Sequence, residues 1–128
     1  MVSSLEVKVN GEIKLACFGM QSIMELQEHY GSVEKLADAF KKNQTSLHVC
    51  IIYYTLKSGL DSKGKILDFS ITDVYEWIND EENLQEFINL IEKFTESYTK
   101  YIKELTEEIK ETGKVAVTDK KKETGVKK

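Results

Sequence analysis

The chain contains no proline and no arginine, and it has only two cysteines and two histidines. Arginine is the residue that best forms bidentate contacts with phosphates and carboxylates, so its absence argues against phosphoryl transfer and base readout. The lack of proline fits a mostly helical chain. Cys17 and Cys50 show no Cys-x-x-Cys spacing, so we expect buried thiols rather than a zinc site or a disulfide. The sequence predicts no metal and no cofactor.

Long apolar runs are also missing. A membrane-spanning helix needs about 18 or more uncharged apolar residues, and the richest stretch here, LHVCIIYYTL, is much shorter. The first residues, MVSSLEVKVNG, carry charges inside their apolar stretch, unlike a signal peptide. We therefore expect a soluble, cytosolic protein that makes no membrane contact.

Charge is distributed unevenly along the chain. Residues 1–112 hold 20 acidic residues and 12 lysines, a net charge of −8, whereas residues 113–128 hold 2 acidic residues and 6 lysines, a net charge of +4. The acidic body repels phosphate, so nucleic acid is not an expected partner. The segment GKVAVTDKKKETGVKK has little to bury. We therefore predict one mostly helical domain over residues 1–112 and a disordered, lysine-rich tail over residues 113–128.

Apolar and polar residues alternate on both sides of Asn10-Gly11, which predicts a β-hairpin over residues 5–17. A two-residue turn would pair Val7 with Lys14 and place the two apolar rows on opposite faces. A three-residue loop that also includes the preceding valine pairs Val7 with Ile13 and keeps one face apolar. We therefore expect the three-residue loop, with the glycine in the left-handed conformation.

Two short amphipathic segments follow, separated by one glycine. Ser22 and Glu25 have the spacing of a capping box, which predicts a helix that begins near residue 20. Gly31 is suited to the left-handed residue that ends a helix, and Ser32 is suited to capping the next one. The sequence thus predicts a tight helix-glycine-helix corner that turns two apolar stripes toward one core.

The middle of the chain predicts a buried central helix over residues 45–58, because the segment is apolar nearly all round. Thr45 or Ser46 would cap it and Gly59 would end it. A strand is the alternative, since residues 49–54 are rich in β-formers. Segment length and the flanking residues favour the helix. A short helix capped by Ser70 or Thr72 and a long helix capped by Asp80 follow. The predicted helices cover residues 20–30, 32–42, 45–58, 72–79 and 81–111.

The longest predicted helix would measure about 45 Å at 1.5 Å per residue, which is longer than a core of this size. Its apolar residues step by three and four, as in a heptad repeat. They are Leu84, Phe87, Ile91, Phe94, Tyr98, Tyr101 and Leu105, widened by Ile88, Ile102 and Ile109. The far half of this stripe must be buried against a partner or a second copy of the chain. The candidate partner-binding residues are Tyr98, Tyr101, Ile102, Leu105 and Ile109.

No arrangement of residues suggests catalysis. The acidic residues at predicted helix starts are explained by the helix dipole. His29 is expected on the surface and His48 at a helix start, with no nucleophile beside either. We therefore expect that the protein is not an enzyme. The fold class predicted is mainly α: a small helical domain with an N-terminal β-hairpin and a long C-terminal helix.

Four stretches resemble the tail assembly chaperones of long-tailed bacteriophages: GEIKLACFGMQSIMELQEHYGS, VEKLADAF, the apolar helix ending in KSGL, and ITDVYEWI. The likeness spans about residues 11–78. It implies a non-enzymatic protein that binds the tape measure protein, keeps its apolar helices soluble and helps recruit tail tube subunits. It also implies action in the cytoplasm of the bacterial host and absence from the mature virion. The alternative is a regulatory or structural adaptor that dimerises through residues 84–109.

Overall fold

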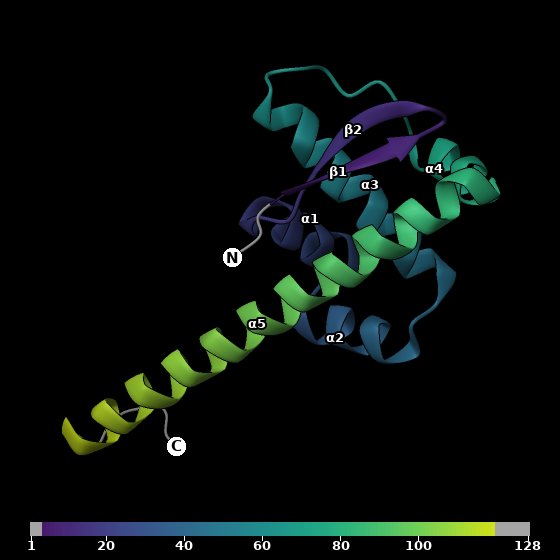
Figure 1. The fold of residues 1–128 in the computed structure, drawn as a ribbon. Coiled ribbons are helices and arrows are strands. Elements are labelled where there is room, and N and C mark those ends of the chain that lie inside the picture. Colours follow the sequence, from purple (N-terminus) through teal and green to yellow (C-terminus); the bar gives the residue numbers. More distant parts are fainter. Residues whose placement is uncertain (1–3, 120–128) are drawn as a thin grey trace. The chain divides into compact units, whose positions relative to one another are not determined.

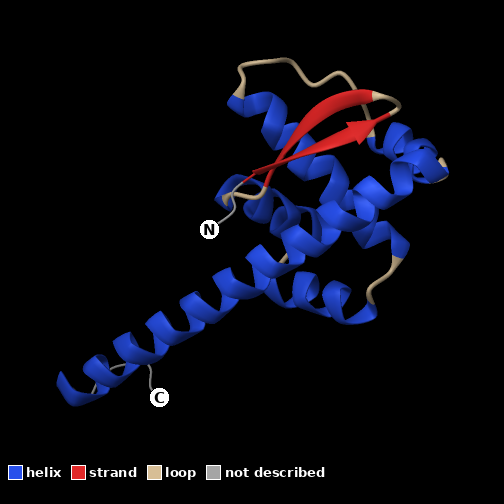
Figure 2. Ribbon diagram, viewed as in Figure 1, coloured by secondary structure: helices blue, strands red, loops and turns tan. Residues whose placement is uncertain are grey.

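A computed structural model describes the backbone of residues 4–119 and the side chains of residues 4–104. The described chain is mainly helical, with one N-terminal hairpin and a long C-terminal helix, as predicted (Figures 1 and 2). It divides into two compact units, Met1–Ser97 and Tyr98–Lys128. The elements are β1 (Ser4–Val9), β2 (Glu12–Cys17), α1 (Met20–Tyr30), α2 (Val33–Lys42), α3 (Thr45–Ser62), α4 (Ile71–Ile78) and α5 (Glu81–Asp119).

The hairpin has a two-residue turn, so the predicted three-residue loop is wrong. Asn10 and Gly11 both have positive φ, 53° and 83°, and Val7 pairs with Lys14. Two positive φ values at the central residues define the type I′ turn that Asn-Gly favours. Val7 lies on the buried face, and the Lys14 ammonium on that same face lies 5.6 Å from the centre of the Trp77 ring. The aliphatic part of a lysine side chain can cover apolar surface in this way. The buried face of the hairpin can therefore contain Lys14 beside apolar residues.

Both outer edges of the hairpin are covered by helices. On the β1 side, the Lys8 N–H donates to Glu86 Oε1 of α5 at 2.8 Å, and the Asn10 N–H donates to Asn83 Oδ1 at 2.8 Å. On the β2 side, the Leu15 main chain lies directly against Gly59 of α3. Exposed strand edges invite pairing with other chains, so these two helices protect the hairpin.

The corner between α1 and α2 is formed as predicted. Gly31 has φ 101° and its N–H donates to Gln27 O, while Ser32 Oγ accepts a hydrogen bond from Lys35 N at 3.1 Å. The predicted capping box at the start of α1 is wrong. The N-cap is Gly19, and the buried Ser22 hydroxyl donates to its carbonyl oxygen at 2.9 Å.

Helix α3 is the centre of the core, which settles the choice between helix and strand in favour of helix. Val49, Ile51 and Ile52 are fully buried. The helix continues four residues past the predicted end, to Ser62, so Gly59 lies inside it. Its N-cap is Gln44 without a side-chain hydrogen bond, so neither predicted cap is used. The absence of a Cβ at Gly59 lets α3 approach β2 closely.

Helix α4 starts with the first of its two predicted caps, Ser70, and α5 with its predicted cap, Asp80. Ser70 Oγ accepts from Asp73 N, and the Asp73 carboxylate accepts from Ser70 N, which makes a full capping box. Asp80 Oδ1 accepts from Glu82 N at 2.9 Å at the start of α5. The α5 backbone is helical to Asp119, past the predicted helix end at residue 111 and into the segment 113–128 that was predicted as a tail. Residues 120–128 of that segment lie outside the described residues.

Candidate partner-binding surface

One face of α5 closes the core of the first unit. Phe87, Leu90 and Phe94 are all fully buried and follow the spacing i, i+3, i+7. The Phe94 ring stacks on Phe40 of α2 with centroids 6.5 Å apart and meets the edge of Phe18 at 6.1 Å. The predicted stripe included residues of this face together with residues of the adjacent face of α5, and it omitted Leu90. The buried face therefore differs from the predicted one.

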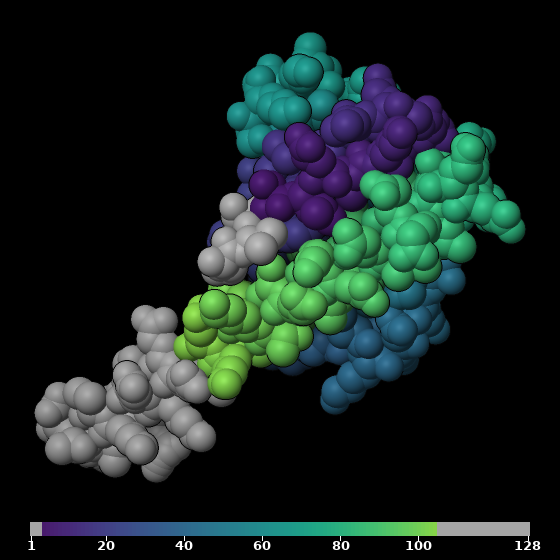
Figure 3. Space-filling view, in the orientation of Figure 1, coloured from purple at the N-terminus to yellow at the C-terminus, as the bar shows by residue number. Residues whose placement is uncertain are grey.

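A second apolar row lies beside the buried face and is partly exposed. We call Leu84, Ile88 and Ile91 the outer stripe. Leu84 and Ile88 are each 40% exposed, and Ile91 is half-buried. Figure 3 shows the first turns of α5, in green, open on the face in view. An apolar row of this kind, at the spacing i, i+4, i+7, can pack against one face of another helix.

The outer stripe is bordered by negative charge. Segment 80–92 contains five carboxylates and no lysine. Glu81, Glu82 and Glu92 are exposed. Net charge around an apolar row keeps it from associating without specificity. The result is an amphipathic, acidic surface rather than a closed core face.

The five predicted partner-binding residues have different positions in the structure. Tyr98 is buried, with 6% of its surface exposed, and burial raises the pKa of its hydroxyl. Tyr101 and Ile102 are half-buried. Leu105 and Ile109 lie on α5 where side chains are not among those described. Partner binding through these residues stays a prediction. Leu84 and Ile88 are also exposed and apolar, but the sequence pattern places them in the apolar stripe of the long helix and not among the partner-binding residues.

The sequence extends the spacing of the outer stripe. Steps of four and three residues lead from Ile91 onward, the heptad pattern of helices that pack along a seam. The positions are Thr95, Tyr98, Ile102, Leu105 and Ile109. Two interleaved apolar rows on one helix explain why a single predicted stripe failed to separate the inward face from the outward one.

A cluster that the sequence did not predict joins α1 to α3. The Cys50 Sγ lies 3.5 Å from His29 Nε2, and the Tyr54 hydroxyl lies 3.3 Å from His29 Nδ1. Burial raises the pKa of the Cys50 thiol, so the reactive thiolate is disfavoured. Burial, the charge of Cys50 and a hydrogen bond to it raise the pKa of Tyr30 to about 12. The cluster is therefore a polar contact between helices and lacks an activated nucleophile.

The remaining candidates for chemistry lead to the same conclusion. His48 Nε2 lies 2.8 Å from Asn43 Oδ1, and burial lowers the pKa of its ring. Within residues 4–104, no three histidine, cysteine or acidic side chains are placed to hold a metal ion. No helix in the described part of the chain combines the length and apolar character needed to cross a membrane. The outer stripe is thus the best candidate for a functional surface in the described unit.

The His29–Cys50 contact had no signal in the sequence, because 21 residues separate the two positions and no motif links them. The outer stripe did have a signal, since Leu84, Ile88 and Ile91 repeat at four and three. No family model, curated protein or solved structure matches the chain.

Proposed function

We propose that this protein is a tail assembly chaperone of a long-tailed bacteriophage, which uses the outer stripe of α5 to bind amphipathic helices of the tape measure protein. The observation that carries the proposal is the exposure of Leu84 and Ile88, each 40%, on an acidic helix. The proposal includes help in recruiting tail tube subunits, action in the host cytoplasm and absence from the mature virion. It follows the resemblance of residues 11–78 and involves no enzymatic activity.

The chemistry of such a task supports the outer stripe as the binding surface. A chaperone for apolar helices needs apolar surface that a client helix can cover, together with charge that keeps the chaperone itself in solution. A client helix laid along α5 would pack its own apolar row against Leu84, Ile88 and Ile91. Glu81 and Glu92, at either end of this row, would favour client helices with flanking basic residues.

A second candidate is an adaptor that dimerises along α5 as a coiled coil. The three-and-four spacing of the outer stripe and its continuation in the sequence favour this reading. The two functions differ in what covers the stripe. A stable dimer that does not bind tape measure helices would identify the adaptor function. A chain that gives up its contacts with a second copy in order to bind those helices would identify the chaperone function.

The experiment is co-expression with the tape measure protein encoded beside this chain, with the soluble fraction of that protein as the readout. The wild type is expected to raise the soluble fraction and to co-purify with the client. The double variant Leu84→Ser with Ile88→Ser should lose both effects, with a melting temperature no lower than that of the control variant. The matched control is Val33→Ser with Tyr75→Ser, because these side chains are 44% and 43% exposed outside the stripe.

Three results would count against the proposal. One is a client that stays insoluble with the wild type. Another is a stripe variant that works as well as the control. The third is a coding region with no tape measure gene or tail tube gene in its neighbourhood.

A further inference from the structure

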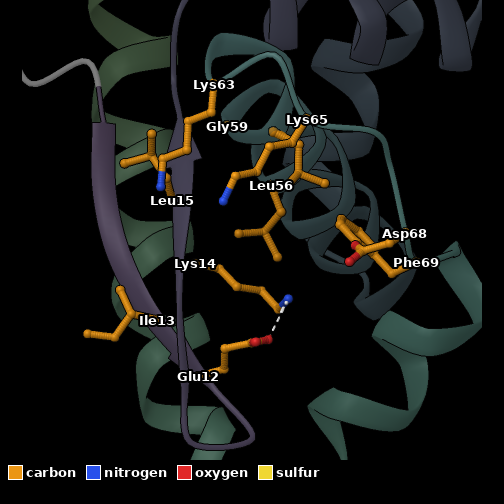
Figure 4. Close-up of a pocket in the computed structure, with 11 residues that line it drawn as sticks. Glu12, Ile13, Lys14, Leu15, Leu56, Gly59, Lys63, Lys65, Asp68 and Phe69 are labelled. Atoms are coloured by element: carbon orange, nitrogen blue, oxygen red, sulfur yellow. Dashed lines mark hydrogen bonds and ion pairs between the residues drawn. The ribbon is translucent and has the colours of Figure 1, made fainter.

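A pocket with a lysine rim lies between β2, the end of α3 and the loop that follows it (Figure 4). It encloses about 150 Å³. The apolar side chains among its walls are Leu15, Leu56, Leu60 and Phe69. We call it the lysine pocket, because the side chains of Lys14, Lys63 and Lys65 end in the space between β2 and the loop.

The cations of the lysine pocket are not all neutralised by the chain. Lys14 forms an ion pair with Glu12 at 3.2 Å. Within the side chains that the structure describes, Lys63 and Lys65 form no ion pair, and both are exposed. Asp68 also lines the pocket, so its three lysines exceed its two acidic residues, Glu12 and Asp68, by one positive charge, and this excess attracts a carboxylate.

Two exposed apolar side chains belong to the segments that form the pocket. Ile13 of β2 is 64% exposed, with its side chain pointing away from the lysines in Figure 4, and Ile66, between Lys63 and Phe69 in the loop, is 89% exposed. These are the two most exposed large apolar side chains among the described residues. A complementary ligand needs an apolar side chain for the walls formed by Leu56, Leu60 and Phe69, together with neighbouring carboxylates for the lysines.

The start of α5 has this chemistry. Leu84 is 40% exposed, and Glu81 and Glu82 lie within one helical turn of it. Segment 80–92 has no lysine that would repel the pocket. The acidic apolar surface and the lysine pocket both belong to the unit Met1–Ser97. Each copy of the chain therefore carries both halves of a complementary pair.

We propose that the protein associates with itself head to tail, the start of α5 of one copy docking on the lysine pocket of the next. Leu84 enters the apolar opening, and Glu81 and Glu82 face Lys63 and Lys65. Such a contact is heterologous, so it extends into a ring or an open chain rather than ending at a dimer. It also covers part of the outer stripe, so a client helix would compete with self-association; this consequence alone rests on the proposed function.

The test is sedimentation of the full chain with paired charge reversals, at low salt and over a range of concentrations. The pocket variant is Lys63→Glu with Lys65→Glu, and the helix variant is Glu81→Lys with Glu82→Lys. Each alone should weaken self-association at least about tenfold, because both copies then carry like charges at the contact. The control is Lys41→Glu with Lys42→Glu on α2, which changes the net charge as the pocket variant does.

An equimolar mixture of the two variants gives the decisive result. Every contact between a pocket variant and a helix variant pairs opposite charges, so the mixture should associate although neither component does. Added salt should weaken the wild-type association, because exposed charges are screened beyond about 10 Å at 0.1 M. A wild type that stays monomeric at all concentrations overturns the proposal. So does a pocket variant that behaves like the control, or a mixture that does not associate.

Discussion

Replacing Gly59 with alanine tests the contact that fixes the hairpin on the core. Gly59 lies inside α3, and a Cβ built there would lie 2.7 Å from the Leu15 carbonyl carbon, with the carbonyl oxygen closer still. Ordinary van der Waals contact for a Cβ begins at 3.4 Å. The hairpin and the helix must therefore separate by at least 0.7 Å, the difference between these two distances. The atoms in conflict are main-chain atoms, so no side-chain rotation relieves them.

Two effects of opposite sign set the magnitude. Alanine is favoured over glycine in a helix interior by about 1 kcal/mol. Overpacking in a closed core typically costs about 1–3 kcal/mol, and more when the backbone must move. We expect the clash to be larger, with a net loss of about 2 kcal/mol in the free energy of unfolding. That corresponds to a fall of roughly 8 °C in melting temperature for a chain of this size.

The measurement is urea unfolding followed by circular dichroism, with thermal melting as a second readout. Gly19→Ala is the control, because a Cβ there meets nothing within 4 Å. Its expected cost is below about 1 kcal/mol, the effect of changing a helix cap. Because helix propensity alone predicts that Gly59→Ala stabilises the protein, the sign decides the matter. A neutral or more stable variant would refute the close packing of α3 on β2.

Three further predictions concern individual contacts. Lys57→Met should lower the free energy of unfolding by about 1 kcal/mol at neutral pH, because the ammonium lies 2.7 Å from the Glu25 carboxylate. The hydrogen bond to Glu25 raises the pKa of Lys57. The ion pair therefore contributes fully to stability below about pH 10.4, and this contribution is lost as the pH rises through the raised pKa of Lys57. Denaturation of the wild type and of Lys57→Met from pH 8 to 11 checks this. Ser70→Ala should cost about 1 kcal/mol through loss of the α4 cap, measured by urea unfolding, and an unchanged midpoint would contradict the capping box. In a Cys17→Ser background, Cys50 should react with a thiol reagent more slowly in the native than in the unfolded protein, because the thiol is buried and burial raises its pKa. Equal rates would show that the thiol is open to solvent.

The elements that local signals specify were predictable from the sequence. The Gly31-Ser32 corner needs only a residue tolerant of positive φ and a hydroxyl cap, and both are visible in the sequence. The caps at Ser70 and Asp80 were found for the same reason. These features depend on neighbours within four residues, so no knowledge of the tertiary fold was required.

The features that depend on distant residues were not predictable in this way. Lys14 is tolerated on the buried face of the hairpin because its stem reaches the rings of Phe69 and Trp77, more than 50 positions away in sequence. Gly59 was read as the end of a helix, whereas its role is to admit the main chain of β2. The caps of α1 and α3 failed similarly, since Ser22 is buried and bonds backward to a carbonyl.

The candidate surface shows the same limit. Periodicity located an apolar helix, but α5 carries two adjacent apolar rows, and spacing alone does not say which row meets the core. Packing against Phe18 and Phe40 selects the row of Phe94 and leaves Ile88 in the other. The orientation of a helix with apolar residues over half of its circumference is decided by its neighbours.

The most direct test compares Ile88→Ala with Leu90→Ala in the free energy of unfolding. The two residues are only two positions apart on α5 but lie on different faces, Ile88 with 40% of its surface exposed and Leu90 with none. We predict a loss of about 3 kcal/mol for Leu90→Ala, the usual cost of truncating a fully buried leucine, and below about 1 kcal/mol for Ile88→Ala. Equal losses for the two variants would mean that the outer stripe is part of the core and not a surface for a partner.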